Sequence, residues 1–258
     1  MVTLKHARAR SPAFRRQNVD GPNHAKPPKG GTTKRIAIAT GVFGVLIAII
    51  VLAAPKPSLY PPGTTFSQRV LDRNGLPLRV TLTKDDKYRL QTPLAEISND
   101  LKQATLLHED RHFFHHPGVN PWAIVRSGWN LLTGGRKTGG STITMQYARL
   151  RFGIRTRSIP GKLNQIVRAI QLERHYSKAE IFEAYLNMAP YGGNVEGIGA
   201  ATYLYLGKSP NKITRREAVA LSVIPQSPAR RTPSRYRANE HLAKAQAGLL
   251  QRIRKLQN

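Results

Sequence analysis

The chain has 258 residues, of which 41 are lysine or arginine and 14 are acidic, so its formal net charge at pH 7 is +27. The length allows one mid-sized domain with a real core, or two small ones. Such a charge would suit nucleic acid, but no RNA-binding or DNA-binding signature accompanies it, and we expect no nucleic-acid partner. Anionic lipid head groups explain the charge better, because each basic side chain near their surface gains about 1 kcal/mol.

The N-terminal part of the chain predicts a membrane anchor. Residues 1–35 are basic and rich in Pro and Gly, which predicts a disordered tail that the positive-inside rule keeps in the cytoplasm. Residues 36–54 form an uncharged apolar run that is long enough to span the hydrocarbon core of a bilayer. A signal peptide cleaved near Ala53-Ala54 is the alternative. A single-pass anchor in the inner (cytoplasmic) membrane places everything from residue 55 in the periplasm or its equivalent.

Residues 55–92 predict an extended lead with a hairpin close to the membrane. β-type residues between 66 and 82 flank Asn74-Gly75, which is a strong hairpin turn signal. From residue 93 to residue 258 the pattern is mainly helical, with no internal repeat. Pro93 is expected to open a helix whose apolar face runs towards Glu109 through Ile97, Leu101, Ala104 and Leu107. Glu109 therefore sits where a helix gives way to a loop.

Start signals predict the later helices. A helix should begin at Asn120-Pro121 and end near Gly134-Gly135. Core packing is the favoured role of its Trp122 and Trp129, and contact with lipid at the membrane interface is the alternative. The other signals are a cap at Ser141 or Thr142, Pro160 at a helix start, capping boxes at Ser177 with Glu180 and Thr214 with Glu217, and a last helix from about Asn239.

The segment of residues 108–118 has two interpretations. His108 and His112 around Glu109 match a zinc-protease signature, which needs both imidazoles on one helical face, a third ligand and a glutamate that activates the metal-bound water. Alternatively, Glu109 and Asp110 form a carboxylate pair near His112 and His116. These neighbours could hold one carboxyl at a pKa suited to general base catalysis. An isolated Glu-Asp pair without other motifs would more simply be part of a surface ion-pair cluster.

Residues 134–140 are glycine-rich and basic, and they precede a hydroxyl-rich helix start. Free backbone N–H groups and the positive dipole end make such a helix start suitable for phosphate oxygens. The basic residues that follow are Arg149, Arg151, Arg155, Arg157 and Lys162. Several of them can converge on a diphosphate. Without other motifs, a charged helix face is an equally good explanation.

From residue 70 to about residue 236 the chain resembles the peptidoglycan glycosyltransferase domain, glycosyltransferase family 51, of monofunctional transglycosylases and class A penicillin-binding proteins. Five motifs carry the resemblance in order: Glu109-Asp110-x-x-Phe113-x-x-His116-x-Gly118; Gly140-Ser141-Thr142-x-Thr144-x-Gln146; Lys162 through Leu172-Glu173; Ser177-Lys178 through Tyr185-Leu186-Asn187; and Glu217-Ala218 through Pro225-Gln226-x-Pro228. Residues 189–194 and 205–210 are most similar to the C-type branch. A transpeptidase domain is not expected in this sequence.

The resemblance implies a lysozyme-like, mainly helical fold that polymerises lipid II. A growing glycan would pass from its polyprenyl diphosphate to the 4-hydroxyl of the acceptor, with inversion and with Glu109 as general base. Expected partners are lipid II, the glycan strand, the membrane and other cell-wall synthesis proteins. No tightly bound cofactor is implied, although Mg²⁺ or Mn²⁺ could assist at the diphosphate. The implied substrate-binding residues are Asp110, Phe113, His116, Ser141, Thr142, Gln146, Arg149 and Lys162.

Three positions depart from the family pattern. Gln165 stands where a second catalytic glutamate is usual, and we assign it to the catalytic pair with Glu109. Met145 replaces the first residue of a Gln-Gln pair, and Gly161 replaces an arginine. An amide brings no charge to a metal or a developing cation, so a catalytically weak or silent lipid II binder is the alternative function, with the zinc metallopeptidase as a third.

Overall fold

The computed structural model describes residues 53–73, 77–122, 126, 130, 133, 140–234 and 238–257. Backbone contacts divide the chain into residues 1–44 and 45–258, and all described residues belong to the second unit. The predicted tail lies outside the described residues, as does the predicted anchor except for Ala53 and Ala54. Within the described part, no helix is both long and apolar enough to cross a membrane.

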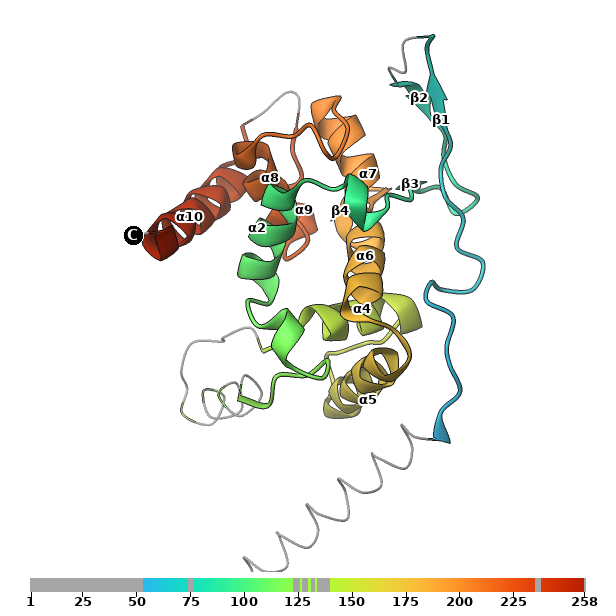
Figure 1. The fold of residues 1–258 in the computed structure, drawn as a ribbon, viewed down its shortest axis with the longest axis vertical. Helices are drawn as coiled ribbons and strands as arrows, with labels where there is room; N and C mark the ends of the chain where they lie inside the picture. The colour runs from blue at the N-terminus through green and yellow to red at the C-terminus, as the bar shows by residue number, and fades with distance from the viewer. Residues whose placement is uncertain are drawn as a thin grey trace, which may run out of the picture. The chain divides into compact units, whose positions relative to one another are not determined.

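The described domain is mainly helical, as predicted (Figure 1). Its longer helices are α2 (Asn99–Glu109), α4 (Ile143–Phe152), α5 (Ile159–His175), α6 (Lys178–Met188), α8 (Arg215–Ser222) and α10 (Glu240–Gln257). Shorter helical turns are η1 (Leu94–Glu96), η2 (Phe113–His115), α7 (Ile198–Ala201), the π-helical η3 (Thr202–Leu206) and α9 (Pro228–Arg231). The strands are β1 (Arg69–Leu71), β2 (Pro77–Val80), β3 (Tyr88–Arg89), β4 (Pro190–Gly192) and β5 (Val195–Glu196).

The predicted hairpin is confirmed. Strands β1 and β2 pair antiparallel, with Arg69 opposite Val80 and a bulge between Val70 and Leu71. The hairpin extends away from the helices (Figure 1), and Arg69 ties it to the domain by a 2.7 Å hydrogen bond to Tyr203 Oη. Its turn residues 74–76 lie outside the described part.

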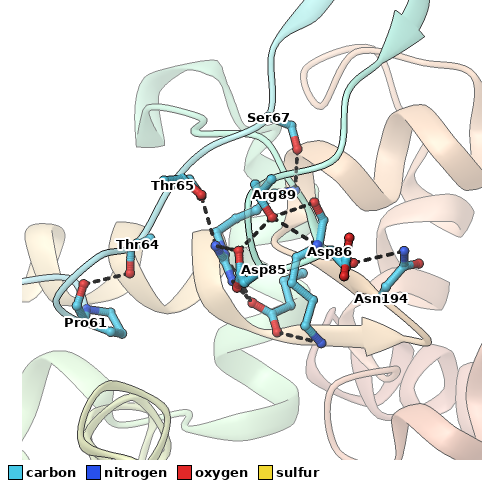
Figure 2. A network of polar contacts seen from close by, with 11 residues as sticks. Pro61, Thr64, Thr65, Ser67, Asp85, Asp86, Arg89 and Asn194 are labelled. Carbon is cyan, nitrogen blue, oxygen red and sulfur yellow. Dashed lines mark hydrogen bonds and ion pairs between the residues drawn. The ribbon is translucent and has the colours of Figure 1, made fainter.

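A three-stranded sheet in the order β3-β5-β4 was not predicted, since its strands are only two or three residues long. Arg89 on β3 secures it (Figure 2), because its buried guanidinium bonds to Asp85 at 3.0 Å and to Glu196 on β5 at 2.5 Å. Arg89 also donates to Thr65 O at 2.9 Å, and its backbone N–H donates to Ser67 Oγ. A buried charge is tolerated when its donors are paired in this way. These contacts join the extended lead, residues 55–92, to strand β5.

The helix expected from Pro93 is instead two elements, and this part of the prediction is wrong. Residues 94–96 form the short turn η1, and Ile97 leaves it in an extended conformation. Ser98 then caps α2, accepting from Leu101 N, because a serine side chain satisfies a free N–H at a helix start. The end of the helix was predicted correctly, since Glu109 is the last residue of α2 and Asp110 is its C-cap.

The remaining start signals are confirmed where the structure describes them. Thr142 caps α4, both predicted capping boxes form, and Pro160 lies in the first turn of α5. Asn239 accepts from Leu242 N at the start of α10. Trp122 is 83% exposed, so core packing was the wrong prediction for it; the end of its helix and Trp129 lie outside the described residues.

Two hydrophobic clusters hold the helices. The larger contains the buried faces of α4, α5 and α6 together with Leu101 and Phe113. A smaller cluster joins α2, α8 and α10 through Ala104, Val219, Val223 and Leu249. Figure 1 shows α10 beside α8 and α9, with α2 adjacent. Helix α2 therefore packs against both clusters, through Leu101 and Ala104, and this packing fixes the position of Glu109 at its end.

Candidate active site

Glu109 opens into a polar cavity of about 600 Å³ between α2, α4, α5 and the C-terminal part of the chain. A smaller hollow of about 180 Å³ adjoins it, and both are lined by His108, Glu109, Arg126, Ser141 and Arg252. The other residues that line the larger cavity are Gln146, Arg149, Thr156, Lys162, Gln165, Pro225 and Gln226. Five of the predicted site residues other than Glu109 therefore meet here: Ser141, Gln146, Arg149, Lys162 and Gln165.

The Glu109 carboxyl is buried but only half engaged. Gln146 Nε2 donates to its Oε2 at 2.7 Å, whereas Oε1 has no hydrogen-bond partner among the described residues. Burial raises the pKa of Glu109, and the Gln146 hydrogen bond and the cationic Arg231 oppose that rise. A carboxylate whose charged form is disfavoured and which keeps one free oxygen is suited to accept a proton.

The neighbouring Asp110 has a different environment. Its carboxylate contacts His116 Nε2 at 2.9 and 3.1 Å and accepts from the backbone N–H of Ile143 at 3.1 Å. Ile143 N is one of the free donors at the start of α4, where a negative charge is favoured. Asp110 thus joins the end of α2 to the start of α4, and the two carboxylates have separate roles.

Phe113 and His116 lie behind Asp110. Phe113 is fully buried, packs on Phe182, and carries Lys178 Nζ 4.4 Å from its ring centre. His116 is buried in contact with Asp110. With no exposed surface, Phe113 supports the site in this conformation; substrate contact by Phe113, His116 and Asp110 stays a prediction.

Thr142 is the cap of α4 and also a tie to the first motif. Its Oγ1 accepts from Met145 N at 3.1 Å and donates to Gly118 O at 2.5 Å. Gly118 has φ +80°, and a Cβ there would lie 2.6 Å from Glu173 Cγ. Only glycine adopts that backbone without strain in so little space, so the close approach of the first two motifs depends on it.

Lys162, Ser141 and Gln165 form a hydrogen-bonded group at the cavity wall. Lys162 Nζ donates to Ser141 Oγ at 2.7 Å and to Gln165 Oε1 at 2.9 Å. The amide nitrogen of Gln165, which is 2% exposed, donates to Met145 O at 2.6 Å. Burial and the nearby Arg149 lower the pKa of Lys162. Both ends of the Gln165 amide are therefore used, and they fix the ammonium at the cavity.

Of the five basic residues expected to converge on a diphosphate, Arg149 and Lys162 line the cavity. Arg151 instead binds Ser58, donating to its carbonyl and its hydroxyl at 2.8 Å each. Arg155 and Arg157 are not among the lining residues. The glycine-rich loop predicted to face phosphate lies outside the described residues at positions 134–139.

The local structure explains why position 161 is a glycine. A Cβ at this position would lie 1.9 Å from the backbone oxygen of Arg155. No side chain fits there unless the backbone of the preceding loop moves. The arginine expected here from the resemblance would therefore require the loop at Arg155 to take a different path.

Sequence reasoning missed six residues that line the cavity: His108, Arg126, Thr156, Pro225, Gln226 and Arg252. Arg252 reaches the end of α2 from α10, donating to Leu107 O at 3.2 Å. His108, Arg126 and Gln226 were not assigned to the site, although Gln226 belongs to the fifth motif. The motif gave a signal for Gln226; nothing local in the sequence indicated Arg252, which acts on a residue 145 positions away.

The zinc interpretation does not meet its own geometric requirement. Helix α2 ends at Glu109, and His112 lies beyond it as the cap of η2, so His108 and His112 do not share one helical face. Within the described residues there is no group of three or more His, Cys, Asp or Glu side chains placed to hold a metal ion.

Comparison with known proteins agrees with the geometry. A family model described as Transglycosylase matches residues 74–254. The chain is 45% identical over 168 residues to penicillin-binding protein 1C of Escherichia coli K12, a region that covers 65% of this chain and 22% of that protein. It is 33% identical to penicillin-binding protein 1F of Bacillus subtilis, over 65% of this chain and 23% of that protein, and 32% identical to penicillin-binding protein 1A of Aquifex aeolicus, over 76% and 28%.

The matched region is thus less than a third of the length of each of these relatives. The family model, by contrast, covers most of this chain and includes all five motifs. The chain belongs to the transglycosylase family, whose members include the glycosyltransferase domains of class A penicillin-binding proteins.

Proposed function

We propose that this protein is a peptidoglycan glycosyltransferase that polymerises lipid II for cell-wall synthesis. The observation that carries the proposal is the buried Glu109, in a cavity that Arg149 and Lys162 also line. One of its oxygens is held by Gln146, and the other has no hydrogen-bond partner in the part of the chain that the structure describes. One base and a cationic wall are the parts that glycosyl transfer from a diphosphate requires.

In the reaction, Glu109 Oε1 accepts the proton of the acceptor 4-hydroxyl as that oxygen attacks the anomeric carbon of the donor. The bond from the anomeric carbon to the diphosphate oxygen breaks on the opposite face, and the diphosphate leaves with the electron pair, so the anomeric centre inverts. Arg149 and Lys162 stabilise the charge that develops on the leaving group. Because a diphosphate leaves as a stable anion, no second acid is required.

Gln165 has a supporting role in this scheme. Its amide holds Lys162 towards the cavity and is itself held by Met145 O. A glutamine there is compatible with turnover, because the cation and not a second carboxylate faces the leaving group. This arrangement favours an active polymerase over the silent lipid II binder.

A protein-held divalent cation fits these residues poorly. Mg²⁺ and Mn²⁺ prefer carboxylate and other oxygen ligands. Among the described residues that line the cavity, however, Glu109 is the sole carboxylate, beside the cationic Arg126, Arg149, Lys162 and Arg252. A cation that assisted would therefore be bound through the diphosphate oxygens, and no step above is assigned to one.

Membrane attachment through residues 36–54 is part of the same proposal. Pro55, the first residue after the predicted span, is bonded through its carbonyl to Gln171 Nε2 at 2.9 Å, and Pro57 O accepts from Tyr176 Oη at 2.5 Å. The folded domain thus begins directly after the predicted anchor. This suits an enzyme whose substrates are lipid-linked, with an N-terminus in the cytoplasm and the domain on the other side.

The test is polymerisation of fluorescent lipid II by the full chain in detergent, comparing wild type with Glu109→Gln. We expect the substitution to abolish glycan strands while thermal unfolding stays unchanged. Glu96→Gln is the matched control, because it removes the same charge at an exposed position on η1. Full activity in Glu109→Gln would overturn the proposal, and lipid II binding without turnover by wild type would establish the silent binder instead.

A further inference from the structure

His108 is a partly buried residue at the active site to which the mechanism above gives no role. It occupies the last turn of α2, directly before Glu109, and its side chain is 13% exposed. Both the larger cavity and the adjoining hollow are lined by it. Its Nε2 is buried and has no hydrogen-bond partner among the described residues.

The unpartnered Nε2 faces the unpartnered oxygen of the base. His108 Nε2 and Glu109 Oε1 are 3.7 Å apart, which is too long for a direct hydrogen bond. Two buried polar atoms without partners are costly in a folded protein. An oxygen atom placed about 2.8 Å from each would satisfy both, and both residues line the cavity.

We propose that His108 binds the acceptor hydroxyl: the hydroxyl oxygen lies between the two side chains, donating its proton to Glu109 Oε1 and accepting a hydrogen bond from His108 Nε2–H. This inference rests on the proposed function and adds a second contact to the nucleophile. Two contacts fix both the position of the oxygen and the direction of its O–H bond. A single contact to Glu109 would leave the hydroxyl free to rotate about that bond.

The surroundings of His108 keep its ring neutral. Burial first, and then the nearby Arg231 and Arg252 guanidiniums, lower the pKa of His108 to about 4, while a hydrogen bond with Gln226 opposes them. Glu109 is the acidic group that faces the ring. A neutral imidazole carries one N–H and cannot form a competing ion pair with Glu109 across the neutral pH range.

Gln226, which lines the same cavity, is held in place beside the ring. Its Oε1 accepts from Arg231 Nη1 at 2.9 Å, and Arg231 is itself fixed by a 2.6 Å bond to Val223 O. The proposed contact requires the proton of the neutral ring to lie on Nε2, because the acceptor oxygen accepts from that atom.

During transfer His108 keeps its proton. The acceptor oxygen forms its bond to the anomeric carbon, its proton passes to Glu109, and the diphosphate leaves with the electron pair. The oxygen becomes the glycosidic oxygen and still accepts from Nε2–H. His108 is thus a contact that orients the nucleophile, and Glu109 alone accepts the proton.

The test compares His108→Phe with His108→Gln in the full chain. Phenylalanine keeps the ring and removes the donor, whereas glutamine returns an N–H near the place of Nε2. We expect His108→Phe to lower kcat about 10- to 100-fold, as loss of an orienting contact does, with lipid II binding and thermal unfolding unchanged, and His108→Gln to recover most of the rate. His241→Gln, at an exposed site on α10, is the matched control.

A second comparison separates a structural role from an orienting one. In His108→Phe the loss should fall on kcat with KM unchanged, whereas a structural role would also weaken lipid II binding or lower the thermal unfolding temperature. Activity of His108→Phe within twofold of wild type would overturn the inference, as would equal losses in His108→Phe and His108→Gln. If Glu109→Gln is inactive while His108→Phe is normal, only the role of His108 fails; full activity in Glu109→Gln would overturn the proposed function itself.

Discussion

Lys162 and Gln165, one turn apart on α5, are joined by a 2.9 Å hydrogen bond from the ammonium to the side-chain carbonyl. The amide nitrogen of Gln165 then donates to Met145 O on α4 at 2.6 Å. The ammonium therefore points to the cavity because an uncharged residue holds it from behind. This relationship gives the departure at position 165 a physical meaning, and it leads to the first prediction.

Gln165→Leu should destabilise the fold and slow the reaction. Leucine fills the same space but leaves Met145 O and the ammonium without these partners, and a buried group that loses its hydrogen bond costs about 1–3 kcal/mol. We expect a decrease of that size in the free energy of unfolding, measured with urea, and a lower rate of polymerisation. Gln251→Leu on the exposed face of α10 is the control. An unchanged rate would show that the orientation of Lys162 has no bearing on turnover.

The rate should depend on pH through Glu109. Its pKa is raised by burial, and the base is active only when ionised, so the acidic limb of kcat/KM should lie above the usual range of a carboxyl group. Gln146→Met removes the donor that lowers this pKa, and we expect the limb to move to still higher pH. A limb that stays at the same pH in Gln146→Met would contradict the assignment of Glu109 as the titrating base.

His108 should make the protein less stable in acid. Its pKa is lowered to about 4 in the folded state from 6.5, so between these values the unfolded chain binds a proton that the folded chain does not. Stability from this residue is present above pH 6.5 and is lost as the pH falls towards 4, by about 3 kcal/mol. His108→Phe should reduce that loss, which urea unfolding at pH 7 and pH 4.5 would measure. Equal losses in both proteins would mean that His108 is protonated in the folded state.

Gly161→Ala should be destabilising although it lies in a helix, where alanine is usually preferred. Its Cβ would lie 1.9 Å from Arg155 O, and relieving such a contact costs about 1–3 kcal/mol. Gly248→Ala on α10 is the control, because a Cβ there meets nothing within 4 Å; it should be neutral or stabilising by about 0.5–1 kcal/mol. Thermal unfolding of the two variants should therefore shift in opposite directions or by clearly different amounts.

Local patterns determined much of the fold. The capping boxes at Ser177 and Thr214 and the end of α2 at Glu109 were correct, because each depends on residues within one helical turn. The helix start at Pro93 was wrong, since Ile97 leaves η1 in an extended conformation and Ser98 begins α2. The β3-β5-β4 sheet was missed, because two-residue strands carry no alternation to detect.

The sequence by itself determined the helical domain, the family and the motif residues that meet at the cavity. Each motif consists of residues that lie close together in the chain, so it can be recognised without the structure. Only the tertiary structure decided that Phe113 is covered, that Gln165 holds Lys162 to the cavity wall, and that His108 lies 3.7 Å from the free oxygen of Glu109. It also decided that Arg252 from α10 reaches the end of α2. Such contacts depend on how helices far apart in the chain pack together, and no local pattern of residues encodes that packing.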